Sequence, residues 1–197
     1  MQLHKRDVVA KAAAILDSYG IADLTMRRLA RELDVTPGAL YWHFANKQEL
    51  LGAVADRVLA PACADPEPTG WRMRIEVVCR ALRDALLSHT DGAELVSASF
   101  AAGQSRAVEQ ILGVLAEAAG EAGVDTAHRV QAARTVLHYV LGATADEQSR
   151  LQWDAAGAEL PEHQSVLSGD PSAGFAFGLR LLTDGLAAQR VSTAELG

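Results

Sequence analysis

The chain has 197 residues, of which 49% are hydrophobic and 22% charged, and its formal net charge is −7 at pH 7. This is an ordinary composition for a folded globular protein and excludes a wholly disordered chain. No apolar run approaches the ~18 residues that a membrane-spanning helix needs, and the first residues, MQLHKRDVVAKAAAIL, are charged and periodic, unlike a signal peptide. We therefore expect a cytoplasmic protein with no membrane association.

Charge is distributed unequally along the chain. Residues 1–60 carry eight Lys and Arg against seven acids, whereas residues 61–197 carry ten against eighteen. The first part has a net charge of +1 and the second of −8. This asymmetry indicates a small part that can approach a polyanion and a larger acidic part that stays away from it.

The amino-terminal segment has apolar residues at helical spacing. They predict a first helix that ends at Gly20 and whose apolar face is formed by Val8, Ala12, Ile15, Leu16 and Tyr19. Thr25 is a predicted N-cap, preceded by Leu24 as a hydrophobic staple. A second, short helix follows from this cap.

Two short helices, 25–33 and 36–43, are joined by the tight LDVT connection. In the second, Thr36 is the N-cap and Pro37 occupies the first helical position, where a missing N–H costs nothing. A longer helix, about 46–60, opens with a capping box. Two short helices braced by a longer one on each side predict a helix-turn-helix.

The segment APACADPEPTG contains three prolines and separates two parts of the chain. Beyond it, apolar residues again recur at helical spacing, and alternation at period two is hardly found, so we expect an all-α protein. The predicted helices lie at about 71–86, at a shorter segment after SHTDG, at 108–115, at about 126–150 and at 172–189. A loop is expected at 154–173.

The second short helix would enter the major groove by its amino-terminal end. We expect Leu40 and Phe44 to face the core, and we assign Trp42 to core packing as well. Gly38 and Ala39 are small enough to let the helix backbone approach base edges.

Polar side chains complete this predicted surface. Thr36 offers a hydroxyl and a methyl group to bases, and Arg27 could reach a phosphate or a guanine edge. Tyr41, His43 and Lys47 are placed to bind phosphate oxygens.

The segment LTMRRLARELDVTPGALYWHFANKQELL, residues 24–51, resembles the DNA-binding domain of TetR-family repressors. Three later segments resemble the regulatory domain of the tetracycline repressor subgroup, both in their sequences and in their order along the chain. They are ALLSHTDGAEL, LGATADEQ and FAFGLRLLTDGLAAQ. The resemblance implies a DNA-binding domain at 1–47 and a regulatory domain at 48–197, with a ligand pocket and dimerisation helices. It further implies a homodimer that binds a palindromic double-stranded operator and is controlled by a small-molecule effector.

The resemblance also carries specific residues. It implies operator contacts at Thr25, Arg27, Thr36, Pro37, Gly38, Ala39, Tyr41, His43 and Lys47. Because Pro37, Gly38 and Ala39 stand where the tetracycline repressor reads bases with polar residues, the operator sequence does not transfer. Thr36 and Arg27 become the predicted base readers.

Dimerisation in the family uses the two long carboxyl-terminal helices, here about 126–150 and 172–189. The residues expected at that interface are Leu137, Leu141, Phe175, Gly178, Leu179, Leu182 and Leu186. Packing within one chain is the alternative for them, because an Ala- and Leu-rich helix has the same pattern in either setting.

The effector is predicted not to be magnesium-tetracycline. By the resemblance, Val96 stands where that complex needs a metal-binding histidine, and Val78 and Leu82 replace polar and aromatic drug contacts. Ser99, by the same resemblance, still offers a hydroxyl group. The predicted pocket, for a more apolar ligand, comprises Val78, Leu82, Val96, Ser99, Leu112, Leu115 and His138, and ordinary core packing is the alternative for each.

Other function classes have little support in the sequence. No HExxH, GxSxG, P-loop or dinucleotide glycine pattern accompanies the scattered histidines, so we expect no enzyme and no cofactor. Cys63 and Cys79 are too dispersed for a metal site, and a thiol switch would require an exposed cysteine with a lowered pKa. The remaining alternative is a helix-turn-helix protein that binds DNA without an effector, which a solid regulatory core would favour.

Overall fold

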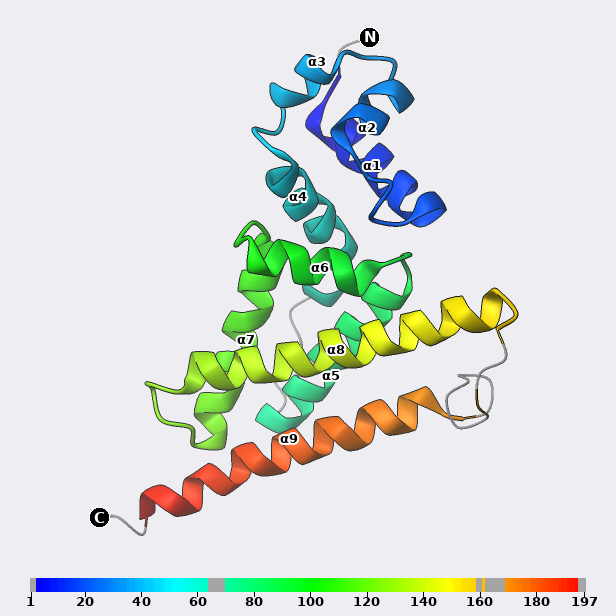
Figure 1. Cartoon of the computed structure of the whole chain (residues 1–197). Coiled ribbons are helices and arrows are strands. Elements are labelled where there is room, and N and C mark those ends of the chain that lie inside the picture. The colour runs from blue at the N-terminus through cyan, green and yellow to red at the C-terminus, as the bar shows by residue number, and fades with distance from the viewer. Residues whose placement is uncertain (1–2, 64–69, 159–160, 162–168, 195–197) are drawn as a thin grey trace.

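The computed structural model describes residues 3–63, 70–158, 161 and 169–194, with side chains to residue 189. Over these ranges the chain forms nine α-helices and one short 3-10 helix, and no strand is found there. The predicted all-α class is therefore confirmed. The amino-terminal helices form a small head at one end of the molecule, and the longer helices form the body (Figure 1).

The head contains α1 (Lys5–Tyr19), α2 (Met26–Glu32) and α3 (Pro37–Tyr41). Both predicted caps are present: Thr25 Oγ1 accepts a hydrogen bond from the N–H of Arg28 at 3.1 Å, and Thr36 Oγ1 accepts one from Ala39 at 3.3 Å. Helix α3 is shorter than the predicted span of 36–43, although the N–H groups of residues 43 and 44 still bond to the carbonyl of residue 40.

Helix α4 (Lys47–Leu59) leads from the head into the body and continues as η1 (Ala60–Cys63). Asn46 Oδ1 caps it by accepting from the N–H of Glu49 at 2.8 Å. The Glu49 carboxylate closes this turn on the N–H of Ala45, one residue earlier than a standard capping box.

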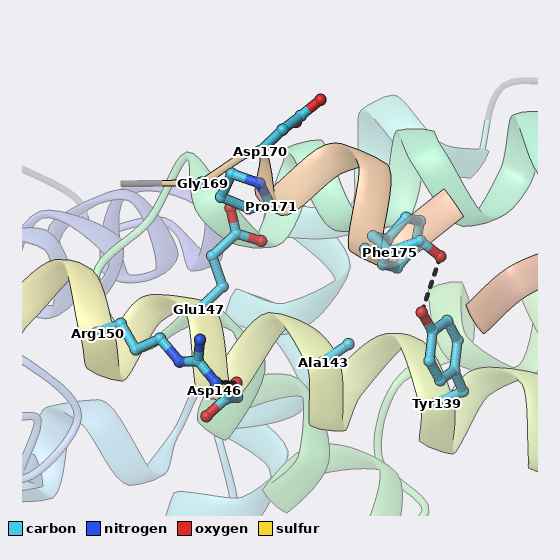
Figure 2. A pocket seen from close by; sticks show the side chains of 10 residues that line it. Tyr139, Ala143, Asp146, Glu147, Arg150, Gly169, Asp170, Pro171 and Phe175 are labelled. Carbon is cyan, nitrogen blue, oxygen red and sulfur yellow. Dashed lines mark hydrogen bonds and ion pairs between the residues drawn. The ribbon is translucent and has the colours of Figure 1, made fainter. Parts of the chain in front are cut away.

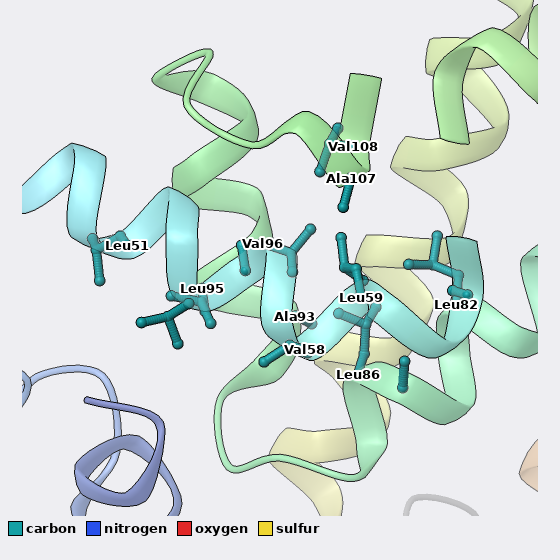
Figure 3. Packing of buried hydrophobic residues seen from close by; sticks show 14 of the residues in the cluster. Leu51, Val58, Leu59, Leu82, Leu86, Ala93, Leu95, Val96, Ala107 and Val108 are labelled. Carbon is teal, nitrogen blue, oxygen red and sulfur yellow. The ribbon is translucent and has the colours of Figure 1, made fainter. Parts of the chain in front are cut away.

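The body begins with α5 (Trp71–Leu87), α6 (Gly92–Ala101) and α7 (Arg106–Ala122). The short helix expected after SHTDG is thus α6. Leu51, Val58 and Leu59 of α4 insert among side chains from all three of these helices (Figure 3). Head and body are joined by a continuous buried core.

Two long helices, α8 (Arg129–Ala155) and α9 (Pro171–Ala194), run side by side along the body (Figure 1). Helix α8 starts later than the predicted residue 126, because the Asp125 carboxylate accepts from the N–H of Ala127 and forms a turn there. It also extends beyond residue 150. The central part of the expected 154–173 loop lies outside the described residues.

No helix in the described ranges combines the length and the hydropathy needed to cross a bilayer.

Candidate nucleic-acid interface

The turn between α2 and α3 fixes the orientation of α3 relative to α2. Asp34 adopts a left-handed conformation, with φ 52°, which Asp tolerates better than most residues. The N–H of Val35 then bonds to the carbonyl of Ala30 at 3.0 Å. The turn therefore fixes where α3 begins and how it leaves α2.

Helix α3 is anchored from below by apolar side chains. Leu40 and Phe44 are fully buried, as predicted, together with Leu24 and Leu29. The ammonium group of Lys5 lies 4.6 Å from the centre of the Phe44 ring. With one side committed to the core, the opposite side of α3 faces outward.

The nine predicted DNA contacts all retain solvent access. Ala39, His43 and Lys47 are half-buried, and the other six are exposed, namely Thr25, Arg27, Thr36, Pro37, Gly38 and Tyr41. Tyr41 is 52% exposed. The head thus presents hydroxyl, imidazole and cationic groups around the start of α3.

Electrostatics distinguishes the two neighbouring arginines of α2. Arg28 forms a salt bridge with Asp23 and stacks on the Tyr19 ring at 3.6 Å. In the described part of the chain, Arg27 and Lys47 have no salt-bridge partner. Their charges are available to an outside anion, as a phosphate contact requires.

The assignment of Trp42 to the core is wrong. Its side chain is 91% exposed, although its neighbour two residues on, Phe44, is fully buried. At about 100° per residue, Trp42 lies roughly 200° around the helix from the buried Leu40. That angle was the available signal, and it places Trp42 beside the predicted reading surface.

Gly38 is not required by packing within the head. A methyl group built at this position would have only the Thr36 hydroxyl within 4 Å, at an ordinary distance of 3.8 Å. The missing side chain therefore leaves backbone exposed at the outer surface of α3, where it can approach a ligand closely.

Comparisons with known proteins agree with this arrangement. Residues 8–54 match the family model described as bacterial regulatory proteins, tetR family, and residues 64–190 match the tetracyclin repressor-like, C-terminal domain. The class A tetracycline repressor from transposon 1721 of Escherichia coli is 32% identical, over 96% of this chain and 93% of the relative. The chain belongs to the TetR family.

Solved structures of BioQ are more similar. BioQ from Mycobacterium smegmatis is 66% identical, with a TM-score of 0.89 over 95% of this chain and 99% of that one. A BioQ structure with its natural double-stranded DNA operator is 63% identical, with a TM-score of 0.83 and the same coverage. The protein is therefore a TetR-family DNA-binding transcriptional regulator, and the family is one of regulators rather than of enzymes.

In this TetR-family chain, the seven predicted ligand residues do not line an open cavity among those described below. Val78, Leu82, Val96, Ser99 and Leu115 are buried, Leu112 is half-buried and His138 is exposed. The Ser99 hydroxyl donates to the carbonyl of Leu95 at 2.9 Å. Thr144 Oγ1, on α8, is buried without a hydrogen-bond partner.

Three cavities lie elsewhere. A groove of about 360 Å³ between α8 and the start of α9 is lined by Tyr139, Arg150 and Phe175 among others, and Tyr139 donates to the Phe175 carbonyl at 2.8 Å (Figure 2). A second, of about 520 Å³, lies between the α7–α8 turn and α9. The third, of about 590 Å³, lies between Lys5 and α4 on one side and residues 103–109 on the other.

The acid Glu147 borders the first groove but is already paired. Arg83 donates to both of its carboxylate oxygens, at 2.9 and 2.7 Å, and the two side chains are only 11% and 12% exposed. This bidentate pair balances the carboxylate charge within the chain.

Four of the residues predicted for dimerisation pack inside the chain itself. Leu137, Leu141, Phe175 and Leu179 are buried in the core. Leu182 and Leu186 are half-buried, and a methyl group at Gly178 would overlap the Tyr139 hydroxyl, so this glycine lets α8 and α9 of one chain approach closely. The exposed apolar residues of these helices are different ones, including Val130, Phe177 and Leu181.

The cysteines do not meet the condition for a thiol switch. Burial raises the pKa of Cys79 to about 12, and burial together with the Asp56 charge raises the pKa of the half-buried Cys63. In the ranges that the structure covers, no group of His, Cys, Asp and Glu side chains is arranged to hold a metal ion.

Proposed function

We propose that this regulator is a homodimeric repressor that binds an inverted-repeat operator and is released by a small-molecule effector other than magnesium-tetracycline. The observation that carries the proposal is the exposed surface around α3, whose counterpart belongs to a protein solved with its operator. We divide the chain into a reading head, 1–47, and a regulatory part, 48–197, with α4 as the connection. Its place of action would be the cytoplasm, where a bacterial operator is found.

Within the head, we assign base reading to Thr36 and Arg27. The Thr36 hydroxyl accepts the capping hydrogen bond from Ala39, so its proton remains available for donation to a base or phosphate acceptor. We assign phosphate contacts to Tyr41, His43 and Lys47 and add Trp42, whose exposed ring extends the same surface. Pro37, Gly38, Ala39 and Thr25 shape the close approach.

The proposed dimer uses the outer faces of α8 and α9. Val130 on α8 and Phe177 and Leu181 on α9 are each more than half exposed, which is costly for large apolar side chains unless a partner covers them. A Leu181→Asp variant should dissociate, with sedimentation velocity as the measurement. A variant that stays dimeric would place the interface elsewhere.

The proposed effector is apolar in character. Val96 is fully buried where a metal-binding histidine would be needed, and Glu147 is neutralised by Arg83. A calorimetric titration that found micromolar, magnesium-dependent tetracycline binding would contradict this part of the proposal.

A second candidate is an effector-independent DNA-binding protein. It is favoured by the packing of Val78, Leu82 and Leu115, which are buried and outside the three cavities described above. A ligand at these residues would have to contact side chains that are buried in this structure. Thermal-shift screening against small apolar compounds separates the two, because only the effector-controlled repressor should gain stability with a ligand that also lowers operator affinity.

Selection from a random duplex library tests the repressor proposal. A dimer with two reading heads should enrich an inverted repeat with its half-site centres separated by about one helical turn, 34–36 Å, or a multiple of it. Enrichment of single, unrepeated sites would contradict the dimer, and the absence of any enrichment would contradict operator recognition.

A further inference from the structure

Lysine occurs only in the proposed reading head. The chain contains 18 Lys and Arg residues, and the lysines among them are Lys5, Lys11 and Lys47. Residues 48–197 contain arginine but no lysine. The guanidinium group of Arg stays protonated in proteins, whereas the amine of Lys can lose its proton and act as a nucleophile. A reagent that modifies side-chain amines therefore acts on the head and leaves the side chains of the regulatory part unchanged.

The amine of Lys5 is engaged by two neighbours. Lys5 Nζ donates to Glu49 Oε1 at 3.1 Å and lies 4.6 Å from the centre of the Phe44 ring. To attack an electrophile, Nζ must give up a proton and leave both the carboxylate and the ring face, which attract a cation. These contacts therefore protect Lys5 from modification.

Lys47 has no such partner. It is the first residue of α4, retains solvent access, and forms no salt bridge in the described ranges. The acid of the same helical turn, Glu49, accepts instead from the N–H of Ala45 at 2.8 Å and from Lys5. The amino-terminal end of a helix is also an unfavourable place for a positive charge. The amine of Lys47 can thus react without losing a contact.

Lys11 is the intermediate case. It lies in the middle of α1 and is half-buried, and the described part of the chain gives it no salt-bridge partner. The charge of a helix end acts only within the first or last turn, so it has little effect on Lys11. The expected order of reactivity is Lys47, then Lys11, then Lys5.

We propose that Lys47 is an acylation site, modified by an acyl phosphate or an acyl thioester, and that its acylation weakens DNA binding. Nζ first gives one proton to water, and the neutral amine then attacks the carbonyl carbon of the donor. An amide bond forms, the bond from that carbon to the phosphate oxygen or the sulfur breaks, and the leaving group takes the electron pair. A second proton passes from the nitrogen to water, so the side chain loses its positive charge. The effect on DNA rests on the proposed function, whereas the reaction does not.

Site-resolved reaction rates test the modification. Full-length protein is treated in separate reactions with acetyl phosphate and with acetyl coenzyme A, and acetylation of each lysine is followed by peptide mass spectrometry. With the reactive donor, Lys47 should react at least about threefold faster than Lys5, with Lys11 between them. In protein unfolded by guanidinium chloride the three rates should converge. Equal rates at Lys5 and Lys47 in the folded protein, or no reaction with either donor, would overturn the proposal.

Matched variants test why the sites differ. Glu49→Gln removes the ion pair of Lys5 and should bring the rate at Lys5 closer to that at Lys47. Glu32→Gln removes an exposed acid of α2 and should change none of the three rates. A rate at Lys5 that is the same in Glu49→Gln and in wild type would overturn this explanation of the selectivity.

Duplex binding before and after acetylation is the second readout. Acetylated wild type should bind operator and random duplex at least about fivefold more weakly, since each head loses one phosphate contact. Lys47→Arg keeps a positive charge but cannot be acylated, so treatment should leave its affinity at its own untreated value. Lys5→Arg and Lys11→Arg should respond to treatment as the wild type does.

The two parts of the proposal fail in different ways. A Lys47→Arg variant that lost as much affinity on treatment as the wild type would overturn the link between Lys47 acylation and DNA binding. A wild-type protein with no operator preference would instead contradict the proposed function, and the reaction rates would still decide whether Lys47 is the acylation site.

Discussion

Trp42 and Phe44 lie two residues apart just after the end of α3 and have opposite environments. Phe44 is fully buried beneath Lys5, whereas Trp42 is 91% exposed. One aromatic side chain therefore holds the head together, and the other belongs to its outer surface.

This contrast predicts opposite mutational effects. Phe44→Ala should lower the free energy of unfolding by about 3–5 kcal/mol, because it leaves a cavity in a small core. Trp42→Ala should change it by less than about 0.5 kcal/mol but weaken DNA binding. Urea unfolding at fixed protein concentration and fluorescence anisotropy with labelled duplex measure the two effects, and a stability loss at Trp42 comparable to that at Phe44 would contradict the structure.

Gly38 separates folding from recognition in another way. Because a methyl group there meets only the Thr36 hydroxyl, at an ordinary 3.8 Å, Gly38→Ala should be neutral or stabilise the head by up to about 1 kcal/mol. Operator affinity should nevertheless fall, since the added group lies where we propose that the backbone approaches the bases. A Gly38→Ala variant with full operator affinity would remove Gly38 from the reading surface.

The Arg83–Glu147 pair predicts a strong energetic coupling. Glu147→Leu alone should cost up to about 3–5 kcal/mol, because the buried guanidinium keeps only a long ion pair with Asp84, at 3.9 Å, while the double variant Arg83→Met/Glu147→Leu should recover most of the loss. A double-mutant cycle by chemical unfolding measures this coupling. Additive single effects, within about 0.5 kcal/mol, would show that the pair acts as two independent residues.

Glu49 predicts an acid-dependent contribution to stability. Its hydrogen bonds from the N–H of Ala45 and from Lys5 lower the pKa of its carboxyl below the ordinary 4.5. The ionised form is thus favoured in the folded state, so the contribution is complete above about pH 4.5 and is lost as the pH falls through the lower folded pKa.

The stability difference between wild type and Glu49→Gln should therefore be constant from pH 6 to 8, on the order of the exposed pair's modest contribution, and shrink below roughly pH 4.5. Unfolding by urea at a series of pH values measures it. Lys5→Met should remove part of the effect, because the Ala45 hydrogen bond remains. A difference that persisted unchanged to about pH 3 would contradict the assignment.

Local signals in the sequence were enough to predict the head. The caps at Thr25 and Thr36 and the buried pair Leu40 and Phe44 depend on neighbours within a few residues, so spacing alone identifies them. Trp42 differs from the prediction because its angle around the helix, and not the usual burial of aromatic residues, decides its environment.

Packing between residues far apart in the chain is harder to predict from the sequence. Periodicity finds the apolar face of a helix but does not say whether the chain itself or a second chain covers it, so Leu137 and Leu179 were predicted at a dimer interface and lie in the chain's own core. The bonds of Asp56 to Ser105 and Ala107 join residues about fifty positions apart, and no sequence spacing encodes them.

Operator discrimination is the most direct test of the account. We expect the wild-type protein to bind its selected operator at least about 10³-fold more tightly than random duplex at roughly 150 mM salt, as specific regulators do. Arg27→Ala should reduce that ratio, whereas Lys47→Ala should weaken both affinities alike. A ratio near one for every candidate operator, with binding that follows only the salt concentration, would contradict the central claim.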